Sequence, residues 1–173
     1  MVFAGAGLDS TLKELIRSSI RPVALGNQQA REKFKRFTAE HLAAVDGPID
    51  RSTLAKILVS PHGIQEELFA RYERNLTGGS LQSASQVATV RGALGINDRE
   101  IRERVKDGSL LAQMFGARSE IIHELDLVPA GRHSRKLSHV RNFAREALEV
   151  CQEIVNAVSR IVGVSSVSSR EDR

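Results

Sequence analysis

Apolar residues near the end of the chain repeat every three or four positions across three heptads. This seam comprises Leu137, Val140, Ala144, Ala147, Cys151, Ile154, Val158 and Ile161. Further apolar residues that widen the stripe are Leu148, Val155 and Val162. Such a repeat is typical of a helix that packs at a shallow angle against other helices. It predicts a helix from Ser134 to Val162, about 43 Å long at 1.5 Å per residue.

The rest of the chain predicts shorter helices separated by helix stops, and no segment has the alternation of a strand. We expect helices over residues 9–22, 27–45, a short stretch after 50, 60–78, 80–94, 97–107 and 109–125. In the first of these, Thr11 and Glu14 have the spacing of a capping box and Pro22 ends the helix. The sequence therefore predicts an all-α helical bundle. It forms one domain over residues 1–162, followed by a disordered tail over 163–173.

Several classes of protein are excluded by composition. The single cysteine cannot form an internal disulfide, which favours a reducing, cytoplasmic location. Cys151 lies on the seam and is interpreted as a small apolar residue rather than a nucleophile. No apolar run reaches the length of about 18 residues that a membrane span needs, and Met1 to Leu8 lacks the basic region of a signal peptide. No phosphate-binding loop, Cys-x-x-Cys or His-Glu-x-x-His motif occurs, so we expect no metal and no cofactor.

Positive charge is concentrated just before and inside the last predicted helix. The chain has a formal net charge of +4. The stretch from Arg132 to Arg145 has five Lys or Arg residues and no acid, so the remainder carries −1. A basic patch on a near-neutral body predicts an anionic partner such as nucleic acid. A solvated start of the helix explains the same pattern, and both interpretations remain open.

The segment from Arg118 to His123 is the strongest candidate for a functional site. Arg118 falls in line with the apolar positions of the predicted helix over 109–125. A guanidinium at such a position must reach solvent or bind an anionic group, because an unpaired buried charge is very costly. Simpler interpretations are a salt bridge from Arg118 to a neighbouring helix and a contact between His123 and Glu120.

The motif Arg118-x4-His123, followed by a loop and a long amphipathic helix, resembles the HEPN superfamily, particularly its RiboL-PSP-type members. The opening stretch Gly5-Ala6-Gly7-Leu8-Asp9 is also similar to the start of such domains. The resemblance covers most of the chain in the order of helices, and it reaches the level of a motif only around Arg118 and His123. One residue departs from the family pattern: Ser119 stands where the family has Asn, Asp or His.

The resemblance implies a metal-independent endoribonuclease that acts as a homodimer, with the two Arg-x4-His motifs meeting at the interface. Residues five apart on a regular helix are rotated by about 140°. Arg118 and His123 of one chain therefore reach one phosphate only if the helix is distorted near Ile122 or a second chain contributes. In this interpretation His123 is the general acid–base and Arg118 stabilises the charge on the phosphate.

Other residues have supporting roles in the same interpretation. Ser119 and Glu120 orient the catalytic pair. The residues that bind the RNA backbone are Arg132, Arg135, Lys136 and Arg141. The family context implies a toxin or phage-defence effector, with an antitoxin or other neutralising protein as partner.

Two alternatives come from other functional classes. A non-catalytic HEPN-like helical module would bind nucleic acid or a protein partner through the basic helix, and Ser119 favours it. A helix-turn-helix DNA-binding unit from Asn97 to Leu125 has a suitable turn at Asp107-Gly108. That unit offers only Arg118 as a residue to read bases.

Overall fold

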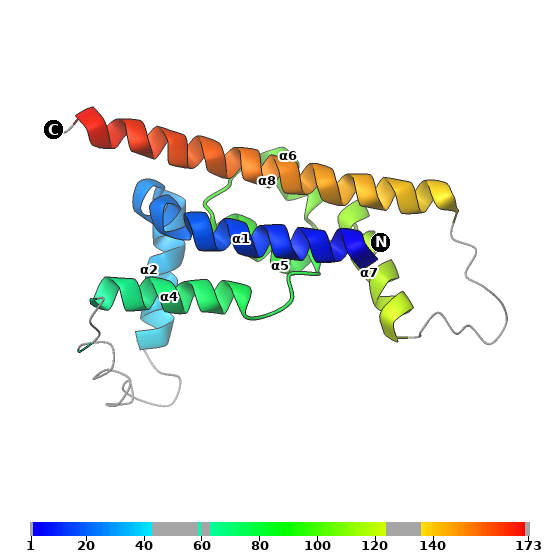
Figure 1. The fold of residues 1–173 in the computed structure, drawn as a ribbon, viewed down its shortest axis with the longest axis horizontal. Helices are drawn as coiled ribbons and strands as arrows, with labels where there is room; N and C mark the ends of the chain where they lie inside the picture. The colour runs from blue at the N-terminus through cyan, green and yellow to red at the C-terminus, as the bar shows by residue number, and fades with distance from the viewer. Residues whose placement is uncertain (1, 43–58, 60–62, 124–135, 172–173) are drawn as a thin grey trace.

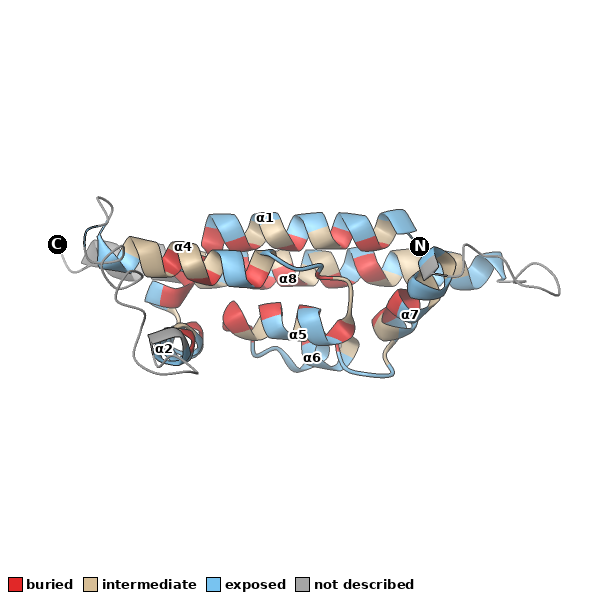
Figure 2. Ribbon diagram, turned by 90° about the horizontal axis from the view of Figure 1, so that it is seen from below, coloured by how far each residue is buried: buried red, intermediate tan, exposed pale blue. Residues whose placement is uncertain are grey.

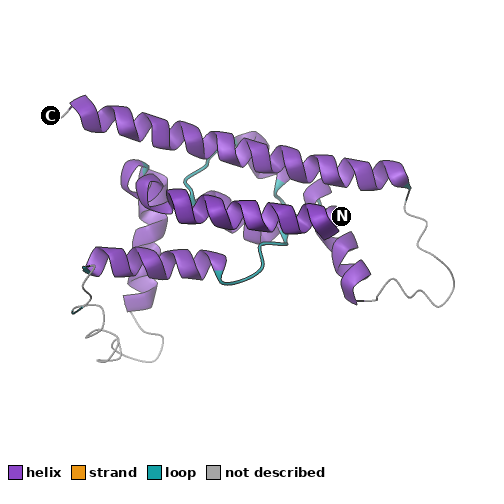
Figure 3. Cartoon of the chain, viewed as in Figure 1, coloured by secondary structure: helices purple, strands orange, loops and turns teal. Residues whose placement is uncertain are grey.

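The computed structural model describes residues 2–42, 59, 63–123 and 136–171. All regular structure in these residues is helical, and the helices share one hydrophobic core (Figures 1 and 3). The helices are α1 (Val2–Gly26), α2 (Gln28–Leu42), α4 (Ile64–Thr77), α5 (Ala84–Ala93), α6 (Arg99–Arg104), α7 (Leu110–His123) and α8 (Leu137–Glu171). The protein is an all-α bundle with a long C-terminal helix, as the sequence predicts.

Helices α1 and α8 form the centre of the bundle. Both begin at the same end of the molecule and run side by side in the same direction (Figure 1). Leu12 and Ile16 of α1 and Val150 and Ile154 of α8 are completely buried. Viewed from below, α1, α4 and α8 form one layer, and α2, α5, α6 and α7 form a second layer against it (Figure 2).

Helix α1 is longer at both ends than predicted. It begins at Val2 and continues through Pro22 to Gly26. The predicted capping box is therefore wrong, because Thr11 lies inside the helix. Leu8, before the predicted start, and Val23, after Pro22, are both buried in the core. Burial on both sides outweighs the cost of a proline inside a helix, which removes one backbone hydrogen bond and crowds the carbonyl of the preceding turn.

The helices between α1 and α8 follow the predicted order. Four of these helices begin after a residue whose side-chain oxygen accepts a backbone N–H group two or three residues later. These capping residues are Asn27, Ser83, Asp98 and Ser109. Such caps compensate N–H groups that a first helical turn leaves without partners. The cap of α6 is Asp98, one residue after the predicted Asn97. The predicted short helix after residue 50 lies outside the described residues.

Helix α8 differs from its prediction in length and in the residues that widen its buried stripe. It continues past Val162 to Glu171, so residues 163–171 are helical where a disordered tail was expected. Leu148 is 70% exposed, whereas Val150 and Ala157 are buried. The stripe therefore widens through Val150 and Ala157, on the opposite side of the seam from Leu148, while the predicted Val162 packs half-buried against the core. The position of the neighbouring helices decides which side is buried, and a heptad pattern does not contain that information.

Cys151 lies half-buried against the core, between α8 and α1. Burial raises the pKa of its thiol, and a hydrogen bond with Thr11 opposes this effect only in part. The thiol is therefore protonated at neutral pH and packs as a small, weakly polar group. This environment agrees with the interpretation of Cys151 as a packing residue.

One arginine joins α6 to α8. The Arg104 guanidinium binds three carboxylates on successive turns of α8, those of Glu146, Glu149 and Glu153. The Arg104–Glu146 contact is 2.8 Å long. Hydrogen bonding to Glu146, and then to Glu149, raises the pKa of Arg104 despite its partial burial. This cluster fixes the short helix α6 against the middle of α8.

We expect Ile154→Ala to lower the free energy of unfolding by about 2–5 kcal/mol, because it leaves a cavity in the core. The matched change Leu148→Ala on the same helix should cost less than about 0.5 kcal/mol, since the side chain is exposed. Urea denaturation followed by circular dichroism measures both values. A loss at Leu148 as large as that at Ile154 contradicts the observed orientation of α8.

We expect Arg104→Met to lower the free energy of unfolding by about 2 kcal/mol, because it leaves three neighbouring carboxylates without their shared cation. Arg99→Met, on the same short helix, is the control, since Arg99 is exposed and the change should cost less than about 0.5 kcal/mol. Chemical denaturation of the two variants provides the comparison. Equal free energies of unfolding for the Arg104→Met and Arg99→Met variants would mean that the Arg104 cluster does not hold α6 in place.

Candidate functional site

The segment from Arg118 to His123 forms the last part of α7. Ser109 caps this helix, its hydroxyl accepting the N–H of Ala112 at 3.2 Å. Leu111, Met114 and Phe115 anchor it in the core. Helix α7 lies at the end of the bundle where α1 and α8 begin (Figure 1). The candidate site is therefore at one end of the molecule, supported by the starts of two long helices.

Helix α7 remains α-helical from Leu110 to His123. A distortion near Ile122, which would bring the ends of Arg118 and His123 together, is therefore absent. On this regular helix the two Cα–Cβ directions differ by about 140°.

Arg118 lies across the start of α1. A Cβ atom added at Gly5 would be 3.0 Å from Cδ of Arg118 and 3.4 Å from its Nε. Because Gly5 has no side chain, there is room beside it for the aliphatic stem of Arg118. The resemblance to the start of HEPN domains drew attention to Gly5 in the sequence, but this close approach is visible only in the structure.

The Arg118 guanidinium has an unsatisfied polar atom. Its Nε is buried and has no hydrogen-bond partner in the described part of the chain. Arg118 also forms no ion pair with any described residue, so the expected salt bridge to a neighbouring helix is not found there. Buried polar groups without partners are uncommon in folded proteins, and a bound ion, a water or a functional role is among the explanations for them.

The structure describes some of the other predicted site residues on α7. Ser119 and Glu120 are exposed. His123 is the final residue of α7, and its side chain lies outside the described residues. The position of the imidazole relative to Arg118 or Glu120 therefore stays a prediction.

Two of the four predicted RNA-binding residues are described. Lys136, just before α8, and Arg141, in its second turn, are exposed. This part of α8 is at the same end of the bundle as α7 (Figure 1). Arg132 and Arg135 lie outside the described residues. The structure thus places the described cations at the end of the molecule that also holds Arg118.

Exposed apolar side chains also occur at this end. Phe3, in the first turn of α1, is 92% exposed, and Leu137, the first residue of α8, is 73% exposed. Ile122, near the end of α7, is exposed as well. Phe3 lies before the start of the predicted first helix, so nothing in the sequence singled it out. Exposed apolar side chains at one end of a molecule offer area for contact with another macromolecule.

The alternative of a helix-turn-helix unit is disfavoured by the packing of α7. A recognition helix must present its side chains to the major groove. In this structure Met114 and Phe115 of α7 are buried in the core, and the stem of Arg118 lies against Gly5. The only candidate for reading bases is thus directed toward α1.

No described residues form a metal-binding cluster of three or more His, Cys, Asp or Glu side chains. Within the same residues, no helix combines the length and the apolar character required to cross a membrane. A scan against protein-family models, a search of curated proteins and a search of solved structures each found no match to this chain.

We expect Gly5→Val to lower the free energy of unfolding by about 1–3 kcal/mol, because the added side chain collides with the Arg118 stem. Gly7→Val is the matched control: a Cβ at Gly7 has no neighbour within 4 Å, so the change should be within about 0.5 kcal/mol. Thermal and urea denaturation measure both. In an Arg118→Ala background the penalty at Gly5 should shrink, and an unchanged penalty would contradict the contact.

Proposed function

We propose that the protein is a metal-independent endoribonuclease of HEPN type, with a composite site at a homodimer interface. The observation that carries the proposal is the state of Arg118. Its Nε is buried without a described partner, at an end of the bundle that also bears exposed cations and apolar residues. An anionic phosphate on this guanidinium would balance its charge, with which no described residue forms an ion pair.

The regular shape of α7 supports a dimeric site. One chain cannot easily direct Arg118 and His123 at the same phosphate, because the two side chains start about 140° apart on an unbroken helix. A two-fold axis near the end of α7 supplies two arginines and two histidines to one cleft. Phe3, Ile122 and Leu137 offer apolar area for such an interface.

The reaction follows from the two residue types. His123 accepts the proton of an RNA 2′-hydroxyl, and the 2′-oxygen attacks the adjacent phosphorus. The bond from phosphorus to the 5′-oxygen breaks, and the second histidine or a water protonates that oxygen. Arg118 stabilises the negative charge that develops on the phosphate. The products carry a 2′,3′-cyclic phosphate and a free 5′-hydroxyl.

Neighbouring residues assist this reaction in the proposal. Ser119 and Glu120, exposed on α7, orient the catalytic pair. Lys136 and Arg141, exposed at the start of α8, bind the RNA backbone together with Arg132 and Arg135. Contacts of this kind depend on salt and discriminate little between bases.

The biological role in this proposal is that of a cytoplasmic toxin or phage-defence effector held in check by a neutralising protein. The resemblance to RiboL-PSP-type HEPN domains suggests this role. The exposed Phe3 and Leu137 are candidates for contact with such a partner where they are not covered by the second subunit.

A non-catalytic module that binds RNA or protein through the same end of the bundle is the second candidate. Ser119 favours it, since the family has Asn, Asp or His at this position. A hydroxyl still donates and accepts hydrogen bonds, so the catalytic proposal remains the first choice. RNA binding without cleavage by the unmodified protein would select the second candidate.

We expect the purified protein to cleave an unstructured RNA in the presence of EDTA, leaving 2′,3′-cyclic phosphate ends. His123→Ala and Arg118→Lys should each reduce the rate at least about 100-fold, because the first removes the acid–base group and the second the planar fork. His139→Ala, which removes an exposed histidine of α8, is the control and should leave the rate unchanged within about two-fold. Electrophoresis and mass spectrometry of the products follow the reaction. Undiminished cleavage by His123→Ala, or loss of activity in EDTA, would contradict the proposal.

A further inference from the structure

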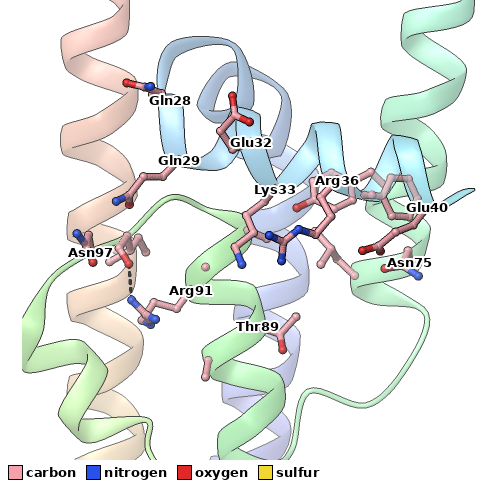
Figure 4. Close-up of a pocket in the computed structure, with 17 residues that line it drawn as sticks. Gln28, Gln29, Glu32, Lys33, Arg36, Glu40, Asn75, Thr89, Arg91 and Asn97 are labelled. Carbon is pink, nitrogen blue, oxygen red and sulfur yellow. Dashed lines mark hydrogen bonds between the residues drawn. The ribbon is translucent and has the colours of Figure 1, made fainter.

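A pocket of about 830 Å³ lies between α2, α4 and α5 (Figure 4). Its volume is in the range that encloses small organic ligands. Helices α2 and α4 are at the other end of the bundle from α7 (Figure 1). This pocket is therefore separate from the proposed ribonuclease site, and none of the site residues predicted from the sequence lines it.

Aromatic and aliphatic side chains form the apolar part of the lining. Phe37, Tyr72 and Leu76 are buried and border the pocket. The rings of Phe37 and Tyr72 have centroids 4.8 Å apart. Burial raises the pKa of Tyr72 to about 12, so its phenol is neutral at physiological pH and adds no negative charge. The small exposed parts of these side chains give the pocket an apolar floor.

Three cationic side chains point into the same pocket. Lys33 and Arg36 come from one face of α2, and Arg91 comes from α5 (Figure 4). Lys33 lies over Gly92, since a Cβ there would be 3.8 Å from Cε of the lysine. Neither Lys33 nor Arg36 forms a hydrogen bond or ion pair with a described residue. Neighbouring cations without counter-charges favour an anion between them.

Arg91 is held more firmly than the other two. Its Nη1 donates to the carbonyl oxygen of Ile96 at 2.6 Å, while its buried Nε has no partner in the described part of the chain. Burial, and to a smaller extent the charge of Arg102, lowers the pKa of Arg91. The guanidinium therefore lies where a bound anion would relieve an electrostatic cost.

The acidic residues of the pocket do not neutralise these cations. Glu32 binds Lys35, with Nζ and Oε1 2.8 Å apart. Glu40 lies beside Asn75, away from Lys33 (Figure 4). Across the pocket in Figure 4 the order is Arg91, Lys33, Arg36, and then Glu40 with Asn75. The carboxylate and the amide suit hydroxyl or amino donors.

We propose that this pocket binds a nucleoside phosphate, with the phosphate between Lys33, Arg36 and Arg91. The base packs on the surface of Phe37 and Tyr72, and the sugar hydroxyls or a base amino group reach Glu40 and Asn75. An apolar surface, an anion site and a hydrogen-bonding end in one cavity match the three parts of a nucleotide. The inference goes beyond the proposed ribonuclease, since it uses none of the same residues.

Isothermal titration calorimetry of the full chain tests this site with AMP, UMP, adenosine and inorganic phosphate. We expect AMP or UMP to bind, and adenosine and phosphate to bind at least about ten-fold more weakly. Failure of both nucleotides to bind overturns the proposal. Adenosine binding as tightly as AMP overturns the phosphate assignment, and phosphate binding as tightly as AMP overturns the nucleoside assignment.

Two double variants with the same change in charge locate the binding. Lys33→Gln/Arg36→Gln should weaken nucleotide binding at least about ten-fold. Arg17→Gln/Arg145→Gln removes two exposed cations that do not line the pocket, and it should bind as the unmodified chain does. Circular dichroism checks that both remain folded. Equal weakening in the two double variants would overturn the assignment.

His123→Ala distinguishes this site from the proposed ribonuclease. It should bind nucleotide as the unmodified protein does, even though it fails to cleave RNA. Loss of nucleotide binding in this variant would place the nucleotide at α7 and overturn the pocket proposal. If the protein binds nucleotide but does not cleave RNA, the pocket proposal is supported and the ribonuclease proposal is wrong.

Discussion

Burial of the shared face of α1 and α8 is the interaction on which the rest of the structure depends. Leu12 and Ile16 from one helix and Val150 and Ile154 from the other are all completely buried. Because the two helices run in the same direction, the chain between them must return along the bundle. Helices α2 to α7 make that return, and they build a site at each end of it: α7 beside the helix starts, and the α2–α4–α5 pocket at the opposite end.

Local patterns in the sequence predicted the helical fold and the order of helices, since periodicity and caps depend on nearby residues. The predictions failed where tertiary packing overrides local preference. Pro22 does not stop α1, because the residues beyond it are buried. Leu148 faces solvent although it extends the heptad stripe, and Ala157 is buried in its place. These outcomes depend on which helices surround a segment, and a single helix pattern cannot specify that.

The two candidate sites differ in how far the sequence could predict them. Arg118 stood out as a charge in an apolar series, and the structure adds its contact with Gly5 and its unsatisfied Nε. The sequence did not indicate the cluster of pocket cations, because Lys33 and Arg91 are far apart in sequence and come from different helices. Buried polar nitrogens without described partners occur on Arg118 and on Arg91. This shared feature links both proposals to anionic ligands.

The central claim is that Arg118 of one subunit and His123 of the other act on the same phosphate. Mixing inactive Arg118→Lys and His123→Ala chains tests it most directly. The heterodimer then contains one intact arginine and one intact histidine, on different chains. Restored RNA cleavage is the predicted result, while either variant alone stays inactive. No restoration, in a mixture where native mass spectrometry demonstrates heterodimers, would contradict the composite site.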